Sequence, residues 1–219
     1  MKQVFKSLSF IVIIGLAASC GGPQGEKAQT GDAQEVSVAT GDVSLKVDVA
    51  ASNVEWTGAK PTGQHNGTIS ISDGSVMLSN GVVVGGKFTI DMNSIVNSDL
   101  TSEEDNAKLV GHLKSPDFFD VAKYPTAVFE ITGADAVNGT PGVTHNITGN
   151  LTMKDVTKSI TFPAMVKIED NKLTAETPAF VIDRTQWNVQ YGSKTLFDNL
   201  KDKFINDEIS LKINLTAEM

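Results

Sequence analysis

The chain has 219 residues, with 18 basic and 26 acidic side chains and a formal net charge of −8. The acidic balance argues against a nucleic-acid partner, because such binding depends on lysines and arginines that neutralise phosphates. The single cysteine excludes an intramolecular disulfide, so the fold has to depend on its hydrophobic core. The length predicts one main domain with a sizeable core.

The N-terminal segment has the layout of a secretory signal. Two lysines precede a short apolar run, FIVIIGL at 10–16, which is too short for a transmembrane helix. Small residues at 17–19 and then Cys20 resemble a bacterial lipobox, with leucine four rather than three residues before the cysteine. We therefore expect 1–19 to be a lipoprotein signal peptide and Cys20 to carry lipid; the alternative is a buried cysteine. The expected location is a bacterial membrane, facing the periplasm, with the outer membrane favoured.

The stretch that follows is small and polar. Residues 20–41 hold almost no bulky side chains, which predicts a flexible tether from the lipidated Cys20. A flexible chain of about twenty residues would reach roughly 25 Å. The folded domain is then expected over 42–219.

From residue 43 onward, apolar and polar residues alternate, as in strands with one buried and one wet face. The clearest case runs from Ile209 to Leu215. Turn signals separate such runs, among them Asp73-Gly74, Asn80-Gly81 and Asp170-Asn171. We expect strands at 43–49, 53–57, 66–72, 75–79, 81–90, 127–137, 147–153, 160–168, 172–182 and 209–215.

Two or three short helices are expected between the strands. Ser102 followed by three acidic residues predicts a helix to about Leu113, and Pro116 opens a turn carrying two phenylalanines. A third helix is expected over 194–201. The fold class is thus all-β and antiparallel with about eight strands, and periodicity alone leaves a sandwich and a closed barrel open.

Four segments resemble the YceI-like family. Residues 111–129 (GHLKSPDFFDVAKYPTAVF) are similar to its most distinctive signature, and 149–163 (GNLTMKDVTKSITFP) to its strand pair. Residues 180–191 (FVIDRTQWNVQY) and 207–215 (DEISLKINL) also resemble family segments. The resemblance covers about 45–219 and implies an extended, lipocalin-like barrel with a long hydrophobic pore.

The resemblance also implies a function. Members bind polyisoprenoids or other long-chain amphiphiles, so the expected ligand is an isoprenoid, an isoprenoid quinone, or a fatty acid or amide. The polar segment 56–68 departs from the family pattern near the expected pore mouth. No cofactor other than bound lipid is expected, the membrane is a partner through the acyl anchor, and a homodimer is compatible with the sequence.

Aromatic and polar side chains of the expected barrel are the candidate ligand contacts, although most barrel aromatics are core residues. Arg184, the only arginine, could hold a head group or form a structural ion pair with Asp183 or another carboxylate. The candidate ligand-binding residues are Trp56, His65, Asn66, Phe88, Phe129, Phe162, Phe180, Arg184, Trp187 and Tyr191.

Catalysis is not expected. The chain has no Gly-x-Ser-x-Gly elbow, and the histidines His65, His112 and His145 fall in separate segments rather than in a metal-binding motif. Two alternatives to a lipid-binding module stay open. One is a surface-interaction protein whose barrel is filled by its own side chains, and the other is a periplasmic enzyme or metal binder that uses those histidines.

Overall fold

The computed structural model describes residues 22–36, 41–169 and 172–219. The expected signal peptide, Cys20 and the Asp170-Asn171 turn therefore lie outside the described residues. Within this part of the chain, no helix is long and apolar enough to cross a membrane.

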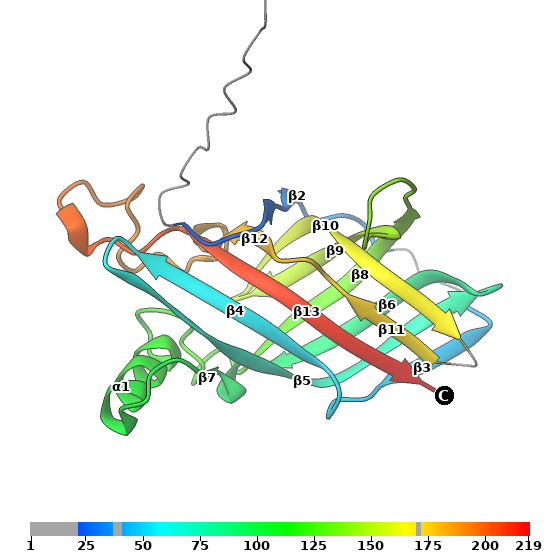
Figure 1. Cartoon of the computed structure of the whole chain (residues 1–219), viewed down its shortest axis with the longest axis horizontal. Helices are drawn as coiled ribbons and strands as arrows, with labels where there is room; N and C mark the ends of the chain where they lie inside the picture. The colour runs from blue at the N-terminus through cyan, green and yellow to red at the C-terminus, as the bar shows by residue number, and fades with distance from the viewer. Residues whose placement is uncertain (1–21, 37–40, 170–171) are drawn as a thin grey trace, which may run out of the picture.

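Eight of the described strands close an antiparallel ring, so the barrel is closed rather than a sandwich (Figure 1). Each strand is hydrogen-bonded to the next, and the last pairs with the first. The ring strands are β4 (Asn53–Lys60), β5 (Gly63–Ser79), β6 (Val82–Asp91), β8 (Thr126–Ala136), β9 (His145–Met153), β10 (Val156–Glu169), β11 (Lys172–Glu176) and β13 (Glu208–Glu218).

The remaining strands extend this wall. They are β1 (Glu26–Lys27), β2 (Gln29–Asp32), β3 (Val43–Val47), β7 (Val96–Asn97) and β12 (Phe180–Asp183). Strand β3 pairs with β5 and with β13, beyond the parts of those two strands that pair with β4. Strand β12 pairs with the first half of β13. The longest strand, β5, has 17 residues, which corresponds to about 55 Å of extended chain.

Most strand ends shift by a few residues, and in two places the division of the chain into strands differs from the prediction. The expected strands 66–72 and 75–79 are one strand, and the register shift between Ile71 and Asp73 is a bulge rather than a hairpin turn. Gly74 is needed there because an added Cβ would meet the Phe88 ring at 2.9 Å. The expected strand 172–182 is instead divided into β11 and β12.

Residues 26–32 of the expected tether instead form part of the barrel wall. Strand β1 pairs with β12, and β2 pairs with β10, so 26–32 fill the gap between two strands that do not pair with each other (Figure 1). The Asn150 side chain donates to the Gln34 carbonyl at 2.7 Å and accepts from the Gln34 N–H at 2.9 Å. The flexible-tether prediction is therefore wrong over 26–32. Backbone and amide hydrogen bonds, which composition does not reveal, hold this polar segment in place.

Helical structure in the described residues consists of one α-helix and three single-turn 3-10 helices. Helix α1 (Glu103–Lys114) confirms the prediction, with the Ser102 hydroxyl accepting from the Asp105 N–H at 3.3 Å. The 3-10 helices are η1 (Met92–Ser94), η2 (Arg184–Trp187) and η3 (Lys201–Lys203). The helix predicted over 194–201 is absent, because its residues 194–199 are all exposed and have no face to pack.

Candidate functional site

The barrel encloses a cavity of about 390 Å³, lined almost throughout by apolar side chains. Such a volume lies in the range that small-molecule sites occupy, about 300–1,000 Å³. The cavity wall includes the exposed residues Lys60 and Gly63 in the β4–β5 hairpin, whereas Val83 and Leu173 toward the opposite end are buried. The cavity therefore reaches the surface at the hairpin end, which we call the open end.

Four of the predicted phenylalanines form a continuous run of ring contacts along the inside of the barrel wall. Phe88 contacts Phe129 with ring centroids 6.3 Å apart, Phe129 lies 5.6 Å from Phe162, and Phe162 stacks on Phe180 at 4.5 Å. All four line the cavity. Because β6, β8, β10 and β12 each contribute one ring, the run forms an aromatic side of the wall.

Trp56 lines the cavity from β4, opposite Gly67 of β5. A Cβ on Gly67 would lie 2.9 Å from the indole Cζ2, so glycine leaves the space that the indole occupies. The indole Nε1 is buried and has no hydrogen-bond partner among the described residues. Trp56 thus brings a buried donor without a hydrogen-bond partner to a largely apolar cavity wall.

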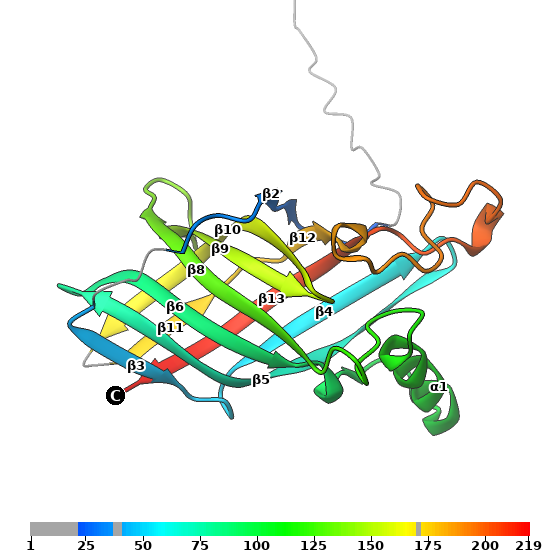
Figure 2. The same cartoon turned by 180° about the vertical axis from the view of Figure 1, so that it is seen from behind.

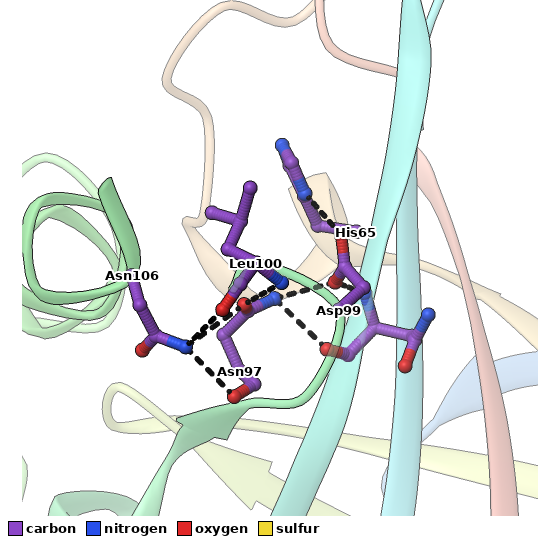
Figure 3. Close-up of polar contacts among 6 residues, drawn as sticks. His65, Asn97, Asp99, Leu100 and Asn106 are labelled. Atoms are coloured by element: carbon purple, nitrogen blue, oxygen red, sulfur yellow. Dashed lines mark hydrogen bonds and ion pairs between the residues drawn. The ribbon is translucent and has the colours of Figure 1, made fainter. Parts of the chain in front are cut away.

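His65 lies near the open end and is oriented by a polar network between β5, β7 and α1 (Figure 3). Its Nδ1 lies 2.8 Å from Oδ2 of Asp99, and the other carboxylate oxygen accepts from the Asn66 N–H at 2.8 Å and from Asn97 at 2.6 Å. Asn106 of α1 donates to the Asn97 carbonyl at 3.1 Å. The network joins the open end of β5 to the start of the helix.

The carboxylate in this network is held ionised. Burial alone would raise the pKa of Asp99, but the hydrogen bonds that it accepts outweigh burial and lower the pKa. An ionised carboxylate only accepts, so we assign the proton to Nδ1 of His65. The Nε2 atom points away from Asp99 and is left without a partner in this network (Figure 3).

Arg184 borders the cavity, but its guanidinium is used by the protein itself. It is buried and donates to the carbonyls of Val189, Asn206 and Ile205 at 2.6, 3.0 and 3.2 Å. One Nη lies 3.8 Å from the buried carboxylate of Asp207. Of the two alternatives left by the sequence, this geometry matches the structural ion pair.

An aromatic cluster closes the side of the open end next to α1. The His112 ring lies edge-on to Phe118 and Tyr191, with centroid distances of 4.9 and 4.7 Å. Lys154 Nζ donates to the carbonyls of Phe118 and Asn188 at 2.6 and 3.0 Å, and burial lowers the pKa of this lysine. His112 and Phe118 line the cavity, so this cluster is part of its end wall.

Three predicted contacts lie outside the cavity lining. Trp187 is fully buried in the wall, where its Nε1 donates to the Leu151 carbonyl at 2.9 Å. Tyr191 is 44% exposed, and Asn66 contributes its backbone to the Asp99 network. The seven other predicted contacts line the cavity.

Aliphatic side chains make up most of the wall that was not predicted as ligand contacts. The alternation of the strands was the signal that could have found them, since the inward positions are mostly isoleucine, leucine and valine. Examples are Ile69, Ile71, Ile131, Ile147, Leu151 and Ile213.

The three histidines do not form one site. His65 pairs with Asp99, His112 Nε2 lies 3.1 Å from Asp117, and His145 contacts the neighbouring Thr144 hydroxyl. Within the part of the chain that the structure describes, no group of three or more His, Cys, Asp or Glu side chains is arranged to hold a metal ion.

The family follows from the comparison with known domains. The YceI-like domain model matches residues 45–217. The chain belongs to the YceI-like domain family. This confirms the resemblance seen in the sequence, and the closed eight-strand ring agrees with it.

Two solved structures share this fold, and a curated protein matches part of the sequence. Burkholderia cenocepacia BcnA is similar, with a TM-score of 0.56, 24% identity, and coverage of 78% of this chain and 99% of that one. A polyisoprenoid-binding domain from Saccharophagus degradans, implicated in plant cell wall breakdown, also has a TM-score of 0.56, at 17% identity, covering 80% and 97%. A UPF0312 protein from Pseudomonas putida strain GB-1 is 35% identical over 99 residues, 45% of this chain. That match spans 47% of the relative's length.

Proposed function

We propose that this protein binds a long-chain amphiphilic lipid inside its barrel and works at a membrane surface, held there by lipid on Cys20. The observation that carries the proposal is the apolar cavity of about 390 Å³. A barrel filled by its own side chains would leave no such space. The similar polyisoprenoid-binding domain from Saccharophagus degradans supports the ligand class.

The proposed ligand is a polyisoprenoid, an isoprenoid quinone, or a fatty acid or amide, which share a long apolar chain and a small polar head. Transfer of the chain from water into the cavity would supply the binding free energy, at about 0.8 kcal/mol per buried methylene. The head would lie at the open end, where Nε2 of His65 can accept a hydrogen bond and Nε1 of Trp56 can donate one. Arg184 is not assigned to the head group, because backbone carbonyls occupy its donors.

Organic extraction of the natively purified protein, followed by mass spectrometry, tests the ligand. Two variants on β10 form a matched pair: Ala164→Phe fills the cavity from a buried lining position, and Lys167→Phe adds the same side chain on the exposed face. We expect a co-purifying lipid in wild type and in Lys167→Phe, and a strongly reduced amount in Ala164→Phe. Thermal unfolding checks that Ala164→Phe is folded, since overpacking costs about 1–3 kcal/mol. Equal lipid in all three proteins, or none in wild type, would contradict the proposal.

Membrane fractionation tests the anchor separately. We propose that the lipid on Cys20 holds the protein on the periplasmic face of a bacterial membrane, most consistently the outer one. Replacing Cys20 by serine removes the sulfur that would be acylated, and should move the protein from the membrane to the soluble fraction. A variant that stays membrane-bound would refute the lipobox interpretation without affecting the cavity.

A further inference from the structure

Loop 191–206 carries exposed apolar side chains beyond the open end of the barrel. Leu196 and Phe197 are each 49% exposed, and Tyr191 is 44% exposed. The loop projects past the strands (orange in Figure 2), and residues 194–199 are all exposed. Neighbouring exposed leucine and aromatic side chains are typical of surfaces that enter a membrane interface.

The base of this loop is tied to the barrel. Thr195 Oγ1 donates to the Asp207 carboxylate at 2.6 Å, and the Ile205 N–H donates to the Gly192 carbonyl at 2.8 Å. Arg184 adds its bonds to the carbonyls on both sides of the loop base. The apolar tip is therefore presented from a fixed position rather than from a free segment.

The charge of the loop suits anionic head groups. It carries the lysines 194, 201 and 203 against the aspartates 198 and 202, a net charge of +1 on a chain whose net charge is −8. Lysines close to a membrane surface are attracted to anionic lipids. Lys194 lies with its Nζ 5.7 Å from the centroid of the Phe204 ring, which places this cation beside another aromatic side chain of the loop.

The start of the described chain lies at the same place. A Cβ built on Gly22 would lie 4.0 Å from Nδ2 of Asn206, and the Ser210 hydroxyl donates to the Gln24 carbonyl at 2.6 Å. Cys20 stands two residues before Gly22. Two residues span at most about 7 Å. A lipid on Cys20 would therefore enter the bilayer close to the base of loop 191–206.

We propose that loop 191–206 is a membrane-contact tip, with Leu196 and Phe197 in the interfacial region of a phospholipid bilayer and its lysines among the head groups. The proposal rests on the lipid anchor of the proposed function. Its consequence is that the open end of the cavity faces the bilayer, because the Asn206 N–H at the loop base donates to the Ala59 carbonyl, next to Lys60, at 2.9 Å. A ligand could then pass between bilayer and cavity with little exposure to water.

Depth-dependent quenching tests the orientation. The acylated full-length mature protein is reconstituted on vesicles of phosphatidylethanolamine and phosphatidylglycerol that contain brominated acyl chains, which quench nearby tryptophan. The reporters are Phe197→Trp and Leu196→Trp, and wild type gives the background of the two native tryptophans. The matched control is Val82→Trp, because Val82 is 54% exposed at the opposite end of the barrel.

We expect a blue shift and loss of the added emission for Phe197→Trp and Leu196→Trp, and no change for Val82→Trp. Quenching of the Val82→Trp reporter, or of none of the three, would overturn the membrane-contact tip. Flotation separates the two proposals. Protein that floats with the vesicles without quenching at 196 and 197 contradicts only the orientation, whereas protein that does not float and shows no acyl mass on its N-terminal peptide contradicts the anchor.

Discussion

Replacing Arg184 by methionine distinguishes a structural arginine from one that binds a head group. The side chain is 2% exposed and supplies three hydrogen bonds to backbone carbonyls as well as the positive charge beside Asp207. Methionine keeps much of the apolar volume but removes every donor. The variant therefore leaves a buried carboxylate without its countercharge and three carbonyls without a partner.

The expected loss of stability is large. Removing one partner of a buried ion pair costs about 3–5 kcal/mol. If the free energy of unfolding falls by about 2–3 kcal/mol per molar urea for a chain of this size, the unfolding midpoint should fall by roughly 1–2.5 M. Fluorescence of the fully buried Trp187 reports the transition. Lipid bound per folded molecule should stay close to the wild-type value.

Two further variants test whether the loss of stability comes from the unpaired charge. Adding Asp207→Asn to Arg184→Met removes the unpaired negative charge and should recover part of the lost stability. Lys212→Met, at a lysine whose side chain is 43% exposed and lies 3.9 Å from Glu55, should change stability by less than about 0.5 kcal/mol. If Arg184→Met lost bound lipid while its urea midpoint matched wild type, the guanidinium would have to be assigned to the head group, and the structural reasoning would be wrong.

Three other substitutions test the packing of the barrel wall, the polar network around Asp99, and the contact that holds residues 26–32 in the wall. Gly149→Ala places a Cβ against the Phe129 ring and 2.7 Å from the Glu130 carbonyl oxygen, so urea unfolding should show a loss of about 1–3 kcal/mol. Because the pKa of Asp99 is lowered in the folded protein, its contribution to stability is complete above about pH 4 and is lost as pH falls through the folded value. Asp99→Asn should therefore weaken the pH dependence of the unfolding free energy below about pH 4. Asn150→Ala removes both hydrogen bonds to Gln34 and should speed amide exchange in 24–34 while the ring strands stay protected.

Matched controls accompany each of these measurements. Gly31→Ala meets no atom within 4 Å and should leave stability nearly unchanged. Asp73→Asn, at an exposed aspartate, should preserve the acid dependence, and Asn138→Ala, in an exposed loop, should leave exchange in 24–34 unaltered. If a control changed as much as its partner variant, the corresponding contact would not be the cause of the effect.

Period-two alternation was sufficient to predict most strands, because one face of each strand packs into the barrel and the other faces water. It failed where backbone pairing, rather than burial, decides the structure. Residues 26–32 are almost all exposed, so no apolar pattern marks β1 and β2. At Asp73-Gly74 a turn signal coincided with a bulge, and the close approach of Phe88, Val47 and the Lys87 carbonyl explains the glycine.

The candidate site was predictable to the extent that it lies on strands. Phe88, Phe129 and Phe162 occupy inward positions whose orientation follows from alternation. Arg184 begins a 3-10 turn after β12, where alternation no longer determines which way a side chain points. The carboxylate that orients His65 is 34 residues away in the sequence, so spacing could not identify it.

The N-terminal segment connects the proposed anchor to the cavity. A free tether of about twenty residues would hold the barrel at a variable distance from the bilayer, typically roughly 25 Å. Instead, the Gln24 carbonyl, four residues after Cys20, accepts a hydrogen bond from the Ser210 hydroxyl at 2.6 Å, and the same segment fills the gap between β10 and β12 beside the open end. Under the anchor proposal, the distance and orientation of the barrel are therefore set by hydrogen bonds rather than by chain entropy. Because those bonds also close the wall, a change that releases 26–32 should disturb membrane orientation and lipid retention together.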